Sequence, residues 1–153
     1  MEFTSTRSNL SYESSQVIVQ GISQEGGLFV PKSFPKLSEK MIRDLLPMSY
    51  SQRAESILSL YLTDFSKEEI SHCVEMAYSG TFENDMPAPL VELDNNVHIL
   101  ELWHGPTCAF KDMALQLLPH LLVTATKKRK LNKKTVILVA TSGDTGKAAL
   151  DGF

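Results

Sequence analysis

Two segments of the sequence bring together residue types that could carry chemistry. The first, from Glu101 to Asp112, is expected to leave a strand and enter a helix, with Lys111 near the helix start. The positive end of the helix dipole lies there and favours the neutral amine, which is the form of lysine that attacks a carbonyl carbon. Asp112 can offset the dipole by bonding to first-turn amides. An ordinary exposed lysine is the alternative, and position alone does not exclude it.

The second segment runs from Ala140 to Lys147, after an apolar run and at the expected start of another helix. Free backbone amides, small hydroxyl side chains and two glycines predict a site for an anion at the carboxyl end of a strand. The segment is not a Walker A loop, because Thr141 stands where the first glycine is needed and Ala148 follows Lys147. A plain strand-to-helix turn is the alternative, and Lys147 is interpreted as a solvated helix lysine.

Helices are expected to dominate the first half of the chain. Apolar residues recur at intervals of three and four over 54–65 and again over 70–78, which predicts two amphipathic helices. Ser66 and Glu69 predict a capping box at the start of the second helix. A shorter helix is expected to begin after Ser38, whose side chain can cap it. These helices would form the core and carry no chemistry.

The secondary structure of the first thirty residues is harder to predict from the sequence. The run 28–30 indicates a short strand stopped by Pro31. The β-branched residues of 17–19 favour a strand, whereas Gly21 could close a helix there. Both interpretations remain open at this point.

The character of the sequence changes after Pro89. The runs 90–93 and 97–102 are rich in apolar residues, and the turn-forming residues 94–96 join them. This arrangement predicts a β-hairpin.

A largely buried helix is expected over 110–129, and Pro119 should kink or break it. The run 135–140 has no polar alternation, which predicts a parallel strand covered on both faces and hence a βαβ unit. Two such strands cannot complete a domain, so the sequence suggests a fragment. We predict an α/β fold in which a mostly helical region, 1–86, leads into 87–153, the incomplete start of an α/β domain.

The two chemistry-bearing segments together closely resemble those of threonine synthases, a family of pyridoxal-phosphate enzymes with the tryptophan-synthase-β-like (type II) fold. The resemblance rests on His104-Gly105-Pro106-Thr107-x-Ala109-Phe110-Lys111-Asp112 and Ser142-Gly143-Asp144-Thr145-Gly146, and extends to Ser5-Thr6-Arg7 and Gly26–Pro31; Ser8, Cys108 and Pro119 depart from the family pattern. It implies that fold, a pyridoxal 5'-phosphate cofactor, and conversion of O-phospho-L-homoserine and water to L-threonine and phosphate.

The resemblance also implies roles for individual residues. Lys111 would be the catalytic residue, forming a Schiff base with the cofactor and moving protons. Phe110 and Asp144 would contact the cofactor, with Asp144 close to its 3-hydroxyl group. The substrate would be held by four residues: Ser142, Gly143, Thr145 and His104. The family's binding cup for the cofactor phosphate would lie beyond Phe153.

Other functions fit part of the same pattern. A threonine-synthase-like phospholyase would share the fold and the lysine. A dehydratase is disfavoured, because those relatives usually have arginine where this chain has Met113. A non-catalytic domain that keeps the fold for binding is the alternative from another class, and Lys111 and Asp144 argue against it.

Composition excludes several broad classes of function. A net charge of −3 and a pI of about 5.8 give no reason to expect binding to nucleic acid or an anionic membrane. The cluster Lys127–Lys134 is expected to mark a helix end. Cys73 and Cys108 match no metal-site spacing, and their number favours a reducing compartment. Without an apolar signal segment near Met1, we expect a cytoplasmic protein that binds a small molecule and no metal.

Overall fold

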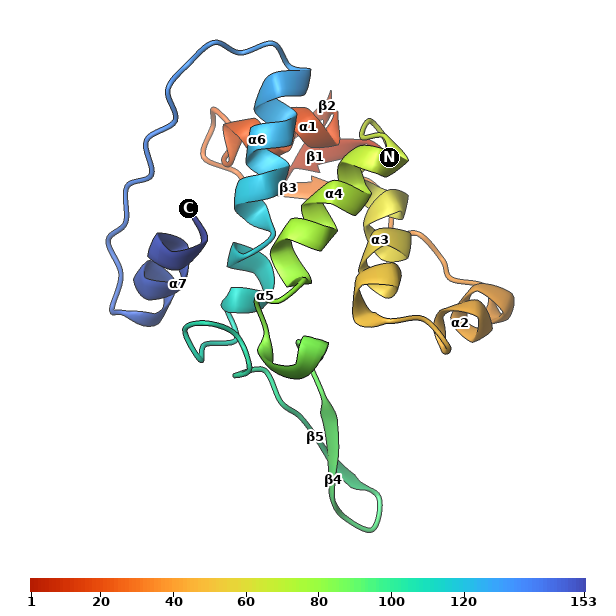
Figure 1. The fold of residues 1–153 in the computed structure, drawn as a ribbon. Coiled ribbons are helices and arrows are strands. Elements are labelled where there is room, and N and C mark those ends of the chain that lie inside the picture. Colours follow the sequence, from red (N-terminus) through yellow and green to blue (C-terminus); the bar gives the residue numbers. More distant parts are fainter. The chain divides into compact units, whose positions relative to one another are not determined.

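The computed structural model describes the backbone from Met1 to Phe153 and the side chains of all residues except Asp85. Figure 1 shows the order of its helices and strands. The chain forms two compact units. The first consists of Met1–Cys73 and Leu121–Lys133, and the second of Val74–His120 and Lys134–Phe153. Both chemistry-bearing segments belong to the second unit.

A small antiparallel sheet begins the first unit. β1 (Phe3–Ser5) lies between β2 (Ser8–Tyr12) and β3 (Phe29–Pro31). β3 confirms the short strand expected in this part of the sequence. Gly27 lies just before this strand. A Cβ atom at this position would lie 2.1 Å from the hydroxyl oxygen of Ser5. The close approach of the Ser5 side chain to the Gly27 backbone therefore requires glycine.

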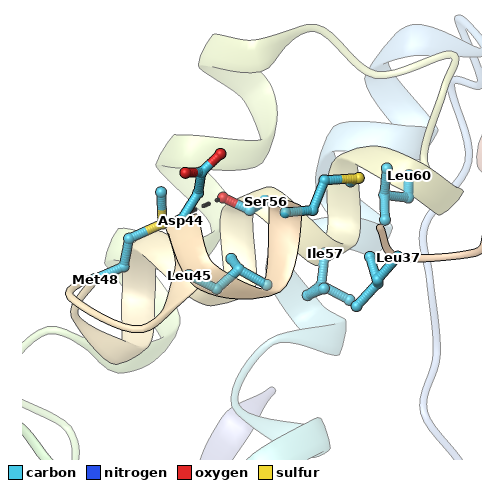
Figure 2. Close-up of a pocket in the computed structure, with 8 residues that line it drawn as sticks. Leu37, Asp44, Leu45, Met48, Ser56, Ile57 and Leu60 are labelled. Carbon is cyan, nitrogen blue, oxygen red and sulfur yellow. Dashed lines mark hydrogen bonds between the residues drawn. The ribbon is translucent and has the colours of Figure 1, made fainter. Parts of the chain in front are cut away.

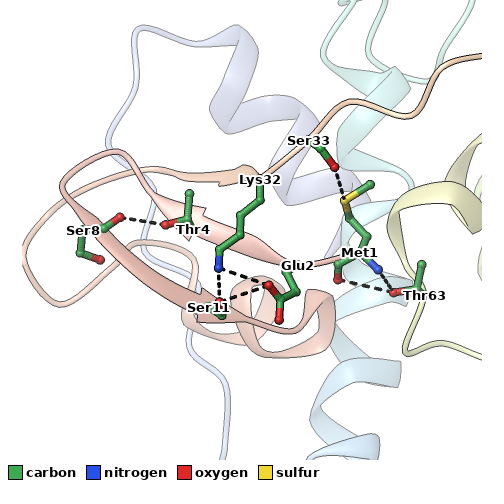
Figure 3. A network of polar contacts seen from close by, with 8 residues as sticks. All are labelled: Met1, Glu2, Thr4, Ser8, Ser11, Lys32, Ser33 and Thr63. Atoms are coloured by element: carbon green, nitrogen blue, oxygen red, sulfur yellow. Dashed lines mark hydrogen bonds and ion pairs between the residues drawn. The ribbon is translucent and has the colours of Figure 1, made fainter.

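Polar contacts fix the amino terminus, as Figure 3 shows. The α-amino group of Met1 donates a hydrogen bond to the hydroxyl of Thr63. Lys32, which follows β3, forms an ion pair with Glu2 at 3.2 Å. The sheet is thereby tied to the loop that follows α3 (Tyr50–Tyr61).

The ambiguous run 17–19 belongs to a helix, α1 (Ser14–Gln20). Gly21 ends it with a φ of 73°, a conformation that glycine adopts without strain. At the other end, Asp64 accepts hydrogen bonds from the Ser14 hydroxyl and, at 3.0 Å, from the Ser15 amide. A carboxylate at the amino end of a helix is stabilising, so this long-range contact favours helix over strand.

Three further helices confirm the predicted ones: α2 (Glu39–Leu45), α3 (Tyr50–Tyr61) and α4 (Lys67–Tyr78). The predicted capping box is present, with the Glu69 amide 3.2 Å from the Ser66 hydroxyl and the Ser66 amide 2.7 Å from the Glu69 carboxylate. It fixes the residue at which α4 begins.

The predicted cap of α2 is also present, because Ser38 accepts a hydrogen bond from the Met41 amide at 3.2 Å. A second capping box, which the sequence did not reveal, links Ser49 and Gln52 before α3. Figure 2 shows the shallow groove beside these helices; its lining is Leu37, Met41, Asp44, Leu45, Met48, Ser56, Ile57 and Leu60.

The first unit has an apolar core to which α6 (Leu118–Lys128) contributes its later turns. The buried residues are Val17, Leu62, Phe65, Ile70, Cys73, Leu121 and Ala125. The Sγ atom of Cys73 lies 3.4 Å from the hydroxyl of Thr124, and burial raises the pKa of the thiol. Lys128 ends the helix and pairs with Glu69 at 3.0 Å, which confirms that the basic cluster marks a helix end.

The second unit contains the predicted hairpin, formed by β4 (Leu90–Asp94) and β5 (Val97–Leu100). The helix expected over 110–129 is interrupted, since α5 (Asp112–Leu115) ends before α6 begins. Pro119 is the second residue of α6, where its missing amide costs no helical hydrogen bond. The predicted break is therefore confirmed, and it leaves Lys111 before a helix of one turn.

The prediction of a parallel strand at 135–140 is wrong, because the structure has no strand there. The run is extended but forms no ladder, and the parallel βαβ unit is likewise not formed among the described residues. The physical reason is that a parallel strand needs a hydrogen-bonded neighbour and cover on both faces. Leu138, by contrast, is 91% exposed. None of the helices formed by the described residues has the length and apolar character that crossing a bilayer requires.

Candidate functional site

Lys111 directly precedes α5, as the sequence predicts. Its Nζ atom lies 4.4 Å from the centroid of the Phe110 ring, and that ring is 62% exposed. Among the described residues, no carboxylate forms an ion pair with Lys111. α5 has only 4 residues, so it offers a smaller dipole than the long helix expected there. Lys111 is thus half-buried, and its amine lies beside an aromatic face without an ion-pair partner among the described residues.

The loop before Lys111 is built around a buried carboxylate. Asp112 is 0% exposed and accepts two hydrogen bonds from Thr107, one from its amide at 2.8 Å and one from its hydroxyl at 2.6 Å. Gly105 makes this possible, because a Cβ atom there would lie 2.5 Å from Oδ2 of Asp112. The residue beside Lys111 therefore fixes the loop, in place of the expected contact with first-turn amides. Cys108, at the tip, has a φ of 56°, which is strained for a residue with a side chain.

His104 is held between two carboxylates. Its Nε2 atom lies 2.7 Å from Glu101, and its Nδ1 atom lies 3.0 Å from Glu83. The Glu83 amide also donates to the carbonyl oxygen of His104 at 3.0 Å. The hydrogen bond to Glu101, followed by that to Glu83, raises the pKa of His104 above its usual value of 6.5. Both ring nitrogens are occupied, so neither is available to a substrate in this arrangement.

The second segment forms a tight turn that opens α7 (Asp144–Gly152). The hydroxyl oxygen of Thr141 accepts hydrogen bonds from the amides of Gly143, at 3.2 Å, and Gly146, at 2.9 Å. Gly143 has a φ of 143°, a conformation that disfavours residues with side chains. A Cβ atom at Gly146 would lie 2.7 Å from the same hydroxyl oxygen. The two glycines are therefore required by the turn.

Ser142, Asp144 and Thr145 stand on this turn, and the first two are exposed. The amides of Asp144 and Thr145 donate to no acceptor among the described residues. Unpaired amides at the start of a helix are suited to an anion. The two unpaired amides agree with the sequence pattern, and anion binding by this turn stays a prediction.

Lys147 is exposed, in keeping with its interpretation as a solvated helix lysine, but its ammonium group also makes one contact within the chain. Its Nζ atom donates a hydrogen bond to the carbonyl oxygen of Thr107 at 3.0 Å. Towards the other end of α7, Asp151 accepts a hydrogen bond from Gln116, which follows α5, at 2.8 Å. A Cβ atom at Gly152 would lie 2.2 Å from the carbonyl oxygen of Leu115, so the two helices pack closely there. These contacts join the two chemistry-bearing segments within one unit.

Sequence reasoning missed three residues of this site. Thr141 was noted only as a departure from a phosphate loop, although Ser or Thr two residues before a turn glycine is a known signal for such a hydroxyl contact. Glu83 and Lys147 make contacts that depend on the folded chain, for which the sequence carries no local signal. No group of three or more possible metal ligands occurs among the described side chains.

Comparisons with known proteins place the chain among relatives of one kind. A family model described as "Threonine synthase N terminus" matches residues 2–78. "Threonine synthase-like 1" of Pongo abelii is 42% identical, covering 91% of this chain and 19% of its own length. The threonine synthase of Schizosaccharomyces pombe is 37% identical, covering 100% of this chain and 31% of its own length.

Solved structures agree with these sequence matches. The PLP-bound threonine synthase of Brucella melitensis has a TM-score of 0.92 at 37% identity, and the match covers 100% of this chain and 33% of that structure. This likeness confirms the predicted fold class. The chain spans a third or less of the length of the relatives described here.

Proposed function

The chain belongs to the threonine synthase family, and we propose that the full-length protein converts O-phospho-L-homoserine and water to L-threonine and phosphate. By full-length protein we mean this chain with any further residues that its gene encodes. It would be a lyase of threonine biosynthesis that uses pyridoxal 5'-phosphate. The observation that carries the proposal is the contact of Lys147 with Thr107, which joins the loop of Lys111 to the turn at 141–146 within one unit.

The residues present suit that cofactor. An aldehyde reacts with the neutral form of an amine, and a nearby anion favours the charged form. Lys111 has no ion-pair partner among the described residues. The exposed ring of Phe110 offers an apolar face beside the amine. When bound, the cofactor acts as an electron sink for carbanion formation at the substrate.

In the proposed reaction, the chain's own residues bind the substrate and move its protons. Lys111 would hold the cofactor through its amine, and the same amine would take and return protons at Cα and Cβ of the substrate. The turn that carries Ser142, Gly143 and Thr145 would bind the substrate carboxylate, and Asp144 would help to hold the cofactor. His104 borders the substrate. Its ring nitrogens already contact Glu83 and Glu101, so its part would be to position the loop.

We also propose a domain organisation, a cellular location and a partner for the protein. Residues 1–86 would form the helical amino-terminal region, and residues 87–153 would begin the α/β domain that binds the cofactor. The protein would act in the cytoplasm, since its two cysteines are free thiols. Its partner would be the small-molecule substrate, and neither nucleic acid nor a membrane.

A phospholyase is the second candidate, because a relative named "Threonine synthase-like 1" is 42% identical to the chain and a threonine synthase is 37% identical. The products separate the two reactions. A threonine synthase releases threonine and phosphate, whereas a phospholyase acting on O-phosphohomoserine releases phosphate, ammonia and a 2-oxo acid. Chromatographic analysis of the products from the full-length protein therefore decides between them.

Borohydride reduction tests the role of Lys111. Reduction of the loaded full-length protein should leave the cofactor on Lys111 as a stable secondary amine, found by peptide mapping. Lys111→Arg should lose this adduct and nearly all phosphate release, because a guanidinium does not form the imine at neutral pH. Lys40→Arg, on the exposed α2, should retain both. An adduct mapped to any other lysine would refute the assignment.

A further inference from the structure

We infer that Lys147 is a positioning residue that holds the anion-binding turn in place against the loop of Lys111. This inference rests on the proposed function, because it assigns a role within the same site. The ammonium group of Lys147 comes from the first turns of α7, and its hydrogen bond ends on the backbone of the other loop, at the Thr107 carbonyl oxygen. It is a direct link between the segment that would bind the substrate and the segment that would hold the cofactor.

The position of Lys147 is electrostatically unfavourable unless its ammonium group has a partner. It is the fourth residue of α7, close to the end of the helix where cations are disfavoured. Helical side chains lean towards the amino terminus of their helix, so this lysine extends back towards its own turn. The Thr107 carbonyl oxygen, 3.0 Å away, supplies the partner.

The acceptor of this hydrogen bond is itself fixed. Thr107 is 6% exposed, and its amide and hydroxyl are both bound to Asp112. Asp112 directly follows Lys111. One chain of contacts therefore runs from α7 through Lys147, Thr107 and Asp112 to the backbone of the cofactor lysine.

A second attachment keeps α7 in place when the first is removed. Gln116 donates to Asp151 at 2.8 Å, and Gly152 lies against the carbonyl of Leu115. Loss of Lys147 should therefore loosen only the turn at 141–146 and the loop at 105–112, while α7 stays docked. This separates a positioning role from a role in overall stability.

Hydrogen exchange of the full-length protein without cofactor tests the inference. Lys147→Met should accelerate amide exchange in peptides covering 105–112 and 141–146, and Lys147→Arg should restore slow exchange. Lys40→Met, the same substitution on an exposed lysine of α2, should change neither peptide. Unchanged exchange in both peptides of Lys147→Met would overturn the inference. Lys147→Gln, whose side chain is too short to reach, repeats the test if the methionine variant fails to fold.

Kinetics of the loaded protein provide a second readout. In Lys147→Met the KM for O-phosphohomoserine should rise about tenfold, as for loss of one hydrogen bond to a charged group, with a smaller change in kcat. Borohydride reduction should still place the cofactor on Lys111. An adduct on another lysine would refute the proposed function, whereas an adduct on Lys111 with unchanged KM would refute only the role of Lys147.

The unmodified protein offers a third measurement. Because its amine is hydrogen-bonded, Lys147 should react with acetic anhydride more slowly than Lys40 in the same sample, as measured by mass spectrometry of the peptides. Equal rates would contradict the contact.

Discussion

Asp112 binds Thr107 at two atoms, with the amide nitrogen at 2.8 Å and the hydroxyl oxygen at 2.6 Å. The carboxylate is fully buried, so these hydrogen bonds are shielded from water. The loop between the two residues is therefore closed on itself, and it presents Lys111 at its edge. A reactive lysine on a flexible loop would have to be ordered each time a ligand binds, whereas this loop is ordered in advance.

The first prediction concerns this buried carboxylate. In Asp112→Asn the side chain loses its charge, so both contacts with Thr107 become weaker hydrogen bonds between neutral groups. The free energy of unfolding should fall by about 1.5–3 kcal/mol in urea denaturation of the full-length protein. Asp44→Asn, at an exposed site on α2, should leave stability unchanged. Equal stability of the two variants would show that the loop does not depend on Asp112.

The second prediction concerns Thr141. Thr141→Val keeps the shape of the side chain but removes the oxygen that accepts from Gly143 and Gly146. By analogy with a lost helix cap, the start of α7 should be destabilised by about 0.5–2 kcal/mol, measured by hydrogen exchange of the Gly146 amide. Thr141→Ser retains the hydroxyl and should behave as the unmodified protein. If both variants exchange alike, the hydroxyl is not what holds the turn.

The third prediction concerns the proposed anion site. Ser142→Ala and Thr145→Ala each remove a hydroxyl that we propose contacts the substrate carboxylate. Substrate binding by the full-length protein should weaken by roughly 1.5–3 kcal/mol, about one to two orders of magnitude, while the cofactor remains on Lys111. Ser59→Ala, an exposed helical site, is the control for the same change. An unchanged KM in both variants would mean that the turn serves the fold alone.

The fourth prediction concerns pH. Contacts with Glu101 and Glu83 raise the folded-state pKa of His104 above its usual value of 6.5. The folded protein therefore keeps a proton on His104 that the unfolded chain releases at lower pH, so the ion pairs stabilise the fold fully below pH 6.5. This contribution should disappear as pH rises through the raised folded-state pKa.

The measurement is the free energy of unfolding across this range for the full-length protein and for His104→Gln. The variant should lack the part of the pH dependence that His104 supplies. NMR titration of the ring should give a pKa above 6.5. A pKa at or below 6.5 would contradict the contacts of His104 with Glu83 and Glu101.

Local patterns predicted most of the helices, because caps and apolar spacing act over a few residues. Ser66 with Glu69 located the start of α4, and Pro119 located the break before α6. The run 17–19 was ambiguous, because the deciding contact of Ser14 with Asp64 crosses fifty residues of sequence. The run 135–140 was assigned by composition, but a strand also needs a partner.

For the candidate site, too, the sequence predicted local features but not the contacts between distant residues. The types and order of residues in the two loops identified Lys111 and the turn at 142–146. What the sequence could not supply was the geometry that links them. The contact of Lys147 with Thr107 joins residues far apart in the chain, and a lysine at that helical position looks like any exposed lysine.

The extended run 135–140 has a consequence for handling the isolated chain. Its backbone hydrogen-bonding groups have no partner among the described residues, its apolar side chains are exposed, and the run carries no charge and no proline. Such a segment can template cross-β pairing between copies, with Lys133 and Lys134 as the charges that oppose it. Solutions of these 153 residues alone should therefore self-associate as salt screens those two lysines.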